Sequence, residues 1–201
     1  MWYRPRMDGL DFFLLRYEQL HRQVVSELLE GLDERAVRGR PHPGVNTIAW
    51  LVWHMARIED VGVNRFVVDR RQVLDDEGWV DRLAVGRRDV GTGMDDAEVD
   101  DLSARIDLAA LRGYWEAVTR RTLAVVPALR GEDLRAPVPA ERVRRVAVEE
   151  GAVAPKAGWL ADFWAGDRSR AWILAQTPLL HVGGHYYEAR VARGLWGHRS
   201  P

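Results

Sequence analysis

A chain of 201 residues is long enough to bury a sizeable core, and we expect a single domain over residues 1–201. It contains no cysteine, which excludes disulfides, thiolate metal sites and a cysteine nucleophile. The 29 basic and 30 acidic residues are spread along the chain and nearly cancel, so nothing indicates a nucleic-acid partner.

The first predicted helix covers residues 8–31, where apolar residues recur at three- and four-residue steps. Either Asp8 or Asp11 is suited to cap its start, and Gly31 is suited to end it. His21 lies on this helix. A lone histidine on an amphipathic helix is typical of the surface or its boundary, and we interpret His21 in that way.

The second predicted helix follows a turn rich in proline and glycine at 38–44. Asn46 is a natural N-cap, and the apolar periodicity continues to about Asp69. His54 falls at the edge of this apolar stripe, so we expect it to be at least partly buried. A buried histidine needs a partner for each ring nitrogen, and the partner is a backbone carbonyl, a carboxylate or a metal.

Residues 70–106 are interrupted by glycines and are densely charged, so we expect a long crossover with short helices near 77–83 and 95–105. A crossover of this length lets the third helix start at the same end as the second. Asp107 is suited to cap that third helix, whose apolar stripe reaches about Leu129.

Residues 131–167 contain three prolines and stretches in which apolar and polar residues alternate. Short strands and a covering loop are both compatible with this pattern. Ser169 is suited to cap a turn of helix that follows.

The last predicted helix covers residues 178–193. A proline inside a regular helix costs about 3 kcal/mol, so Thr177 as N-cap and Pro178 at the first helical position predict a fresh start. Gly194 is expected to end this helix.

Two histidines lie four residues apart in the first half of that helix, His181 and His185. Such a pair projects from one helix face with Cβ atoms roughly 5–6 Å apart, close enough to share a metal ion. His54 is the best candidate for a third ligand, and three histidines with an open position are typical of a reactive metal centre. The alternative is structural, with His54 a satisfied core histidine and the pair lining a helix contact notched by Gly183 and Gly184.

Several segments carry a resemblance to a known family: 46–60 (NTIAWLVWHMARIED), 76–83 (DEGWVDRL), Tyr114 and 185–195 (HYYEARVARGL). The chain resembles the DinB-like superfamily of helical bundles, which includes thiol-dependent S-transferases and maleylpyruvate isomerases. The likeness runs from about residue 8 to 195.

This resemblance implies an all-α fold, an up-down-down-up four-helix bundle with a long crossover between helices two and three. It also implies a divalent metal, zinc or nickel, held by His54, His181 and His185. Relatives often carry glutamine where Glu188 stands, and some lack one of the three ligands. Residues 131–169 match no part of the family pattern.

Two kinds of chemistry follow if the metal is bound. Its uncompensated charge ionises a water near neutral pH, which gives a hydrolase, or binds a thiol as thiolate, which gives a transferase. Because the chain has no cysteine, the thiol would be a low-molecular-weight cofactor. The resemblance favours the transferase.

Four further residues are candidates for the site because they lie close in sequence to the histidines. Glu59 and Glu188 are the nearest carboxylates and are candidates for orienting a ligand or acting as a general base. For Glu59 a solvated helix face is an equal alternative. Trp50 and Arg57 lie one turn on either side of His54 and are candidates to line a pocket and hold an anionic substrate group.

The expected partners are a small-molecule substrate and, in some bundles of this kind, a second copy in a homodimer. No stretch approaches the roughly 18 apolar residues of a membrane span, so we expect a cytoplasmic protein without membrane association. The alternative function is a non-catalytic bundle that binds a metal, a small molecule or a partner, or that dimerises through an apolar helix face.

Overall fold

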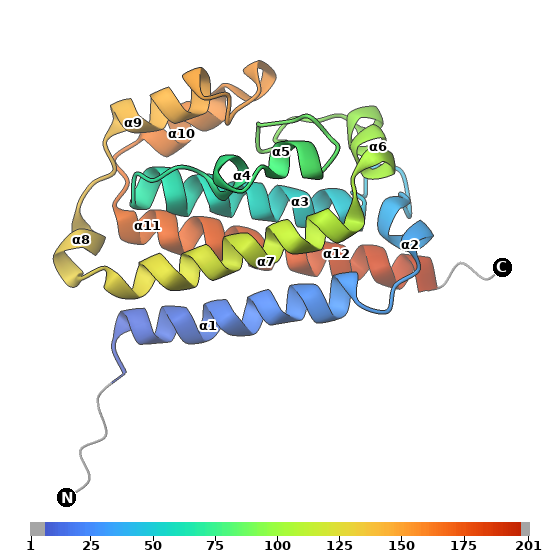
Figure 1. The fold of residues 1–201 in the computed structure, drawn as a ribbon, viewed down its shortest axis with the longest axis horizontal. Coiled ribbons are helices and arrows are strands. Elements are labelled where there is room, and N and C mark those ends of the chain that lie inside the picture. The colour runs from blue at the N-terminus through green and yellow to red at the C-terminus, as the bar shows by residue number, and fades with distance from the viewer. Residues whose placement is uncertain (1–6, 198–201) are drawn as a thin grey trace, which may run out of the picture.

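The computed structural model describes residues 7–197, and this range forms helices and connections without a β-strand. The four longest helical segments lie side by side (Figure 1). They are α1 (Gly9–Val24) with a π-helical turn (Val25–Leu29), α3 (Ile48–Glu59) with a π-helical continuation (Asp60–Val67), α7 (Leu108–Val125), and α11 (Arg170–Ala175) joined through π-helix η6 (Gln176–His181) to α12 (Val182–Gly197). The all-α prediction is confirmed.

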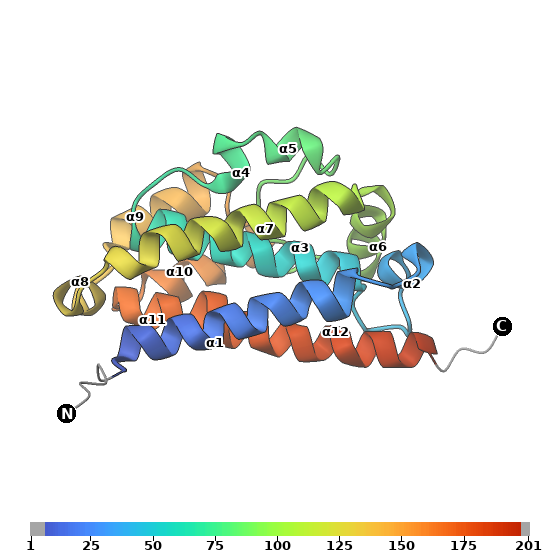
Figure 2. The same ribbon diagram turned by 60° about the horizontal axis from the view of Figure 1, so that its bottom comes forward.

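The helix α1 begins as its sequence predicts. The Asp8 carboxylate accepts hydrogen bonds from the backbone N–H groups of Leu10 and Asp11, and the Asp11 carboxylate accepts from the Asp8 N–H. Beyond the π-helical turn, Gly31 has a φ of +69°, a left-handed conformation suited to glycine. Figure 2 shows α1 running along α12 and α7.

The helix α3 is the centre of the molecule, because every one of its residues is buried. It packs against α7 on one side and α12 on another. Its N-cap is Thr47, whose Oγ1 accepts from the Trp50 N–H at 3.2 Å. The prediction of Asn46 as the cap is wrong because the Asn46 amide donates instead to Glu188 Oε1 at 2.8 Å.

The crossover between α3 and α7 contains short helices, as expected. They are α4 (Val73–Asp76), α5 (Trp79–Arg82) and α6 (Asp96–Arg105). The fully buried Asp60 carboxylate accepts from the N–H groups of Val73 and Leu74, both at 2.9 Å, and so fixes the start of α4 to the end of α3. Asp107 caps α7 by accepting from the Ala110 N–H at 2.7 Å, which confirms that prediction.

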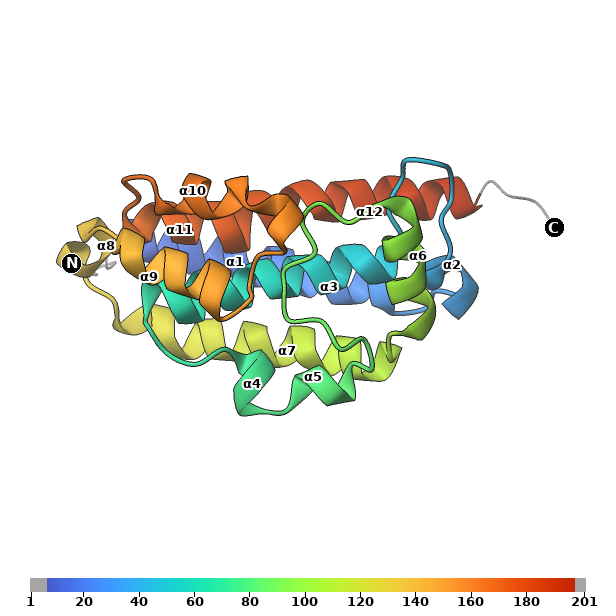
Figure 3. The ribbon, with the colours of Figure 1, turned by 90° about the horizontal axis from the view of Figure 1, so that it is seen from above.

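Residues 131–169 form helices that cover one face of the bundle (Figures 1 and 3). The helices are α8 (Gly131–Arg135), α9 (Ala140–Arg144) with a π-helical turn (Arg145–Glu149), and α10 (Trp159–Ala165); the short α2 (Glu34–Arg38) lies in the connection before α3. The possible strands are therefore wrong. Val143 and Val146 are buried while Val148 is exposed, and this spacing of buried residues is typical of a helix. A stretch of six residues is too short for the sequence to distinguish it from a strand.

The last long helix runs through Pro178 without a break. Ser169 caps α11, as predicted, but the fresh start at Thr177 and the end at Gly194 are both wrong. The wider π-helical turn of η6 accommodates the proline, which has no N–H to place in the helical ladder. The Thr177 hydroxyl donates to the Ile173 carbonyl at 2.9 Å beside this irregularity.

The buried apolar residues form two clusters. One is centred on α3, α7 and α12, and the other on the π-helical end of α3, α9, α10 and α11. No described helix is long and apolar enough to cross a membrane.

Candidate metal centre

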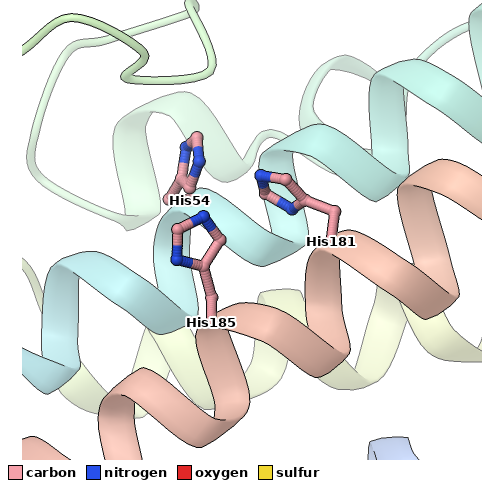
Figure 4. A group of neighbouring side chains, drawn as sticks. All are labelled: His54, His181 and His185. Carbon is pink, nitrogen blue, oxygen red and sulfur yellow. The ribbon is translucent and has the colours of Figure 1, made fainter.

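Three imidazoles meet between α3 and the last long helix (Figure 4). His54 projects from α3, His181 from the end of η6 and His185 from α12. One ring nitrogen of each lies within 4.8 Å of the corresponding nitrogens of the other two. The structure thus brings together the three residues selected from the sequence as ligands.

Hydrogen bonds fix two of the rings. His54 Nδ1 donates to the Val90 carbonyl, and His185 Nδ1 lies 2.7 Å from Glu188 Oε2. With their protons on Nδ1, these rings present the Nε2 lone pairs, a common arrangement of metal-bound histidines.

The third ring supplies a test of whether a metal fits. His181 Nδ1 is buried and makes no hydrogen bond within the described part of the chain. A buried nitrogen without a partner costs about 1–3 kcal/mol. A cation shared by three imidazoles would satisfy their lone pairs, so the donor set fits a divalent metal such as zinc.

Burial favours the neutral form of His54 and His181, which is the form that binds metal. Burial, with a contribution from His185, lowers the pKa of His54 to about 3. Burial also lowers the pKa of His181 well below its ordinary value. Burial by itself raises the pKa of Glu188, but hydrogen bonds from His185 and Asn46 lower it overall, so Glu188 is a carboxylate.

Trp50 is beside the cluster, and Arg57 is not. The Trp50 ring stacks on His54 with centroids 4.6 Å apart. The Arg57 guanidinium is fully buried elsewhere and donates to the Tyr114 hydroxyl at 2.9 Å and to Gln72 Oε1 at 2.8 Å. A residue three positions after His54 is rotated by about 60° around the helix, which turns Arg57 toward α7 and the crossover. The structure does not place it where it would hold an anionic substrate.

Glu59 is also away from the three histidines and is not on a solvated face. Its Oε1 accepts from Tyr17 at 2.5 Å and Thr122 at 2.7 Å, and its Oε2 lies 3.2 Å from His21 Nε2. Burial raises the pKa of Glu59 to about 8 and lowers the pKa of His21 to about 3. The prediction that His21 lies at the surface or its boundary is therefore wrong. His21 is buried, and the carboxyl group of Glu59, which belongs to α3, lies against it in the core.

A cavity of about 530 Å³ adjoins the three histidines. Trp50 lies on one wall, and Trp159 and Phe163 of α10 and Gln176 of η6 contribute to the rest. The sequence analysis did not identify Trp159, Phe163 or Gln176 as site residues. The sequence signal for them is the spacing of four between Trp159 and Phe163, which places both rings on one face of a helix. A larger hollow of about 760 Å³ lies between α1 and α7, but it contains none of the three clustered histidines and so is not the metal centre.

Comparisons with known proteins agree with this architecture. A family model described as the DinB superfamily matches residues 19–166, a range that includes His54 and ends before His181. The match extends through most of residues 131–169, so the expectation that this segment has no counterpart in the family is wrong. A solved structure of a conserved protein from Enterococcus faecalis is similar, with a TM-score of 0.69 and 16% sequence identity over 94% of this chain and 98% of that one. At that identity the likeness shows the fold alone. Comparison with curated proteins gave no match.

Proposed function

Because the chain belongs to the DinB superfamily, we propose that it is a divalent-metal protein whose ion, zinc or nickel, is held by His54, His181 and His185. The observation that carries the proposal is the convergence of three imidazoles, each with a ring nitrogen within 4.8 Å of a ring nitrogen of the other two. Burial favours the neutral form of His54 and His181, and the neutral form is the one that binds metal.

The bundle that presents these ligands is, in our proposal, an up-down-down-up bundle forming one domain. The courses of the helices support it, since α1 and the last long helix run one way in Figure 1 while α3 and α7 run the other. The long crossover between α3 and α7 connects opposite ends and allows this order.

The activity we propose is a metal-dependent transfer of a low-molecular-weight thiol to an electrophilic substrate, or a hydrolysis. A divalent ion at three neutral imidazoles supplies the positive charge that lowers the pKa of a coordinated thiol or water. The family resemblance favours the thiol. The chain contains no cysteine to serve as an internal one.

The chain's own residues prepare this site. The Val90 carbonyl and the Glu188 carboxylate hold the Nδ1 protons of His54 and His185, which keeps the ligand faces of both rings turned inward. Glu188 is anchored in turn by Asn46, so its carboxylate holds the His185 ring in place, and it remains our candidate for a general base. Trp50 stacks on His54 and limits its rotation and its access to water.

Metal content tests the proposal. Purified, untagged protein is incubated with zinc or nickel, desalted and analysed for bound metal beside His185→Ala and the control His42→Ala. His42 is exposed and lies outside the cluster, so its variant should retain about one ion per chain while His185→Ala loses it. Transfer of a small thiol to an electrophile should then require the metal and fail in His185→Ala. Absence of metal from the wild type overturns the proposal.

A non-catalytic, dimerising bundle remains the second candidate because α12 and the end of η6 expose apolar side chains. Leu180, Tyr187, Val191 and Leu195 are all exposed and recur at steps of four or seven residues, as in a helix–helix seam. Sedimentation of the wild type and of Val191→Glu separates the two candidates. The non-catalytic bundle is favoured if the wild type is a dimer, Val191→Glu is a monomer, and the metal-loaded protein shows no turnover.

A further inference from the structure

Two aromatic side chains stand together at the cavity beside the three histidines. Trp159 and Phe163 of α10 line it with 62% and 39% of their surfaces exposed, and their ring centroids are 6.4 Å apart. Isolated exposed apolar residues are ordinary, but grouped ones mark binding surfaces. Here the group lies next to a candidate metal centre.

These rings are held in place by their neighbours. Phe163 contacts Trp172 with centroids 5.6 Å apart, and the Arg168 guanidinium lies over both rings, 5.2 Å from the Phe163 centroid and 4.4 Å from the Trp172 centroid. On another wall, Trp50 is fixed by its stacking on His54 and by its indole N–H, which donates to Met94 Sδ at 3.2 Å. The cavity is thus largely formed in advance, as ligand sites usually are.

The walls carry no ionic side chain. Within the described residues, the lining includes no carboxylate, guanidinium or ammonium group, and its polar members besides the histidines are Thr92, Gln176 and Thr177. The Thr177 hydroxyl is already donated to Ile173, whereas the Gln176 carboxamide makes no hydrogen bond to the rest of the described chain. An anionic ligand body would lose its hydration here without gaining a cationic partner.

From these observations we infer that the cavity binds a neutral, flat organic molecule whose aromatic or conjugated body lies against Trp159 and Phe163. One polar group of that molecule meets the free Gln176 carboxamide, and its reacting end faces the three histidines. The position of the reacting end rests on the proposed function, while the binding of the flat body does not require a metal. The volume of about 530 Å³ is that of a small-molecule site.

The region that supplies these rings gives the inference a second consequence. Both residues lie on α10, which is separate from the long helices that carry the three histidines. The histidines come from the bundle itself, so α10 is the element that determines which molecule this protein selects.

The first experiment uses metal-free protein and two probes of similar shape, neutral 2-naphthalenemethanol and anionic 2-naphthoate, followed by saturation-transfer NMR. The alcohol should bind at least tenfold more tightly than the anion. Phe163→Ala and Trp159→Ala should each weaken alcohol binding at least fivefold, and Phe12→Ala, which removes an exposed ring on α1 outside the cavity, should leave it unchanged. Thermal melts check that the variants fold. Equal binding of both probes, or equal affinity in wild type and Phe163→Ala, overturns the inference.

The second experiment separates this inference from the metal proposal. Cobalt(II) is added as a coloured probe, and its absorption is titrated with acetohydroxamate and benzohydroxamate, which share a metal-binding head and differ by the phenyl ring. The wild type should favour the phenyl compound at least tenfold more than free cobalt does, and Phe163→Ala should lose most of this preference. Cobalt binding without the preference overturns the cavity inference alone. Failure to bind cobalt overturns the metal proposal, and the naphthyl probes then decide the cavity by themselves.

Discussion

Removing the Glu188 carboxylate is expected to weaken metal binding while leaving the protein folded. Glu188 Oε2 lies 2.7 Å from His185 Nδ1, and Oε1 accepts from Asn46 at 2.8 Å, so this side chain fixes both the tautomer and the orientation of one ligand. Loss of such an outer carboxylate typically lowers metal affinity about 10–100-fold, equivalent to about 1.4–2.7 kcal/mol. We therefore expect Glu188→Ala to bind zinc in this range more weakly than the wild type. Glu188→Gln keeps one acceptor oxygen and should lie between the two.

The assay is competition for zinc against a chromophoric chelator, with urea unfolding of each metal-free protein measured in parallel. Glu149→Ala removes an exposed carboxylate from the π-helical turn after α9 and serves as the matched control. An affinity of Glu188→Ala equal to that of Glu149→Ala would refute the role of Glu188. A stability loss in metal-free Glu188→Ala as large as the loss in zinc binding energy would instead make Glu188 a purely structural residue.

Three further perturbations probe the core around the site, each by urea unfolding of the metal-free protein. The pKa of His54 is lowered to about 3 in the folded protein from about 6.5 in the unfolded chain. As the pH falls below about 6.5, only the unfolded chain binds a proton at this residue, so the free energy of unfolding decreases. Wild-type stability should therefore fall between pH 7 and pH 5 by about 2 kcal/mol more than that of His54→Gln, and parallel pH profiles would contradict this. Arg57→Met leaves the buried carboxylate beside it without a cation and should cost about 3–5 kcal/mol; a loss below about 1 kcal/mol would show that the ion pair is dispensable. A Cβ at position 62 would lie 2.4 Å from Thr177 Oγ1, so Gly62→Ala should cost about 1–3 kcal/mol, whereas Gly184→Ala, which meets nothing within 4 Å, should be neutral or stabilising.

The sequence predicts the three-histidine cluster because much of the relevant information is local. His181 and His185 share a face of one helix by their spacing alone, and His54 lies on the most apolar helix of the chain, whose burial follows from its composition. What places the two helices against one another is the family pattern, since spacing within a helix says nothing about the distance between helices.

Errors arise where a residue's partner comes from a distant part of the chain. Glu59 has the sequence context of a residue near His54, yet five positions turn it by about 140° around α3, toward Tyr17 and His21. The apolar periodicity of α1 and of α3 does not indicate that Glu59 faces Tyr17 and His21. The same holds for Asn46, whose amide is taken up by Glu188, so that the cap moves to Thr47.

The walls of the cavity were beyond sequence reasoning for a different reason. Residues 131–169 form short helices interrupted by prolines, and each is too short for a periodic pattern to identify. Trp159 and Phe163 come to line the cavity only because α10 packs across the bundle (Figure 3).

The π-helical turn at Gln176–His181 sets the phase of the whole C-terminal half of the last helix. Relative to an α-helix, one extra residue in a turn corresponds to a rotation of about 100° for everything that follows. His181 is the last residue of this turn and His185 follows it in α12, so the direction of both rings depends on this winding. Deletion of Pro178 would remove both the extra residue and the proline that disfavours regular winding, and would rotate His181 and His185 by about 100° relative to α3. The convergence of the three histidines thus depends on an irregularity in helix winding as much as on their positions in the sequence.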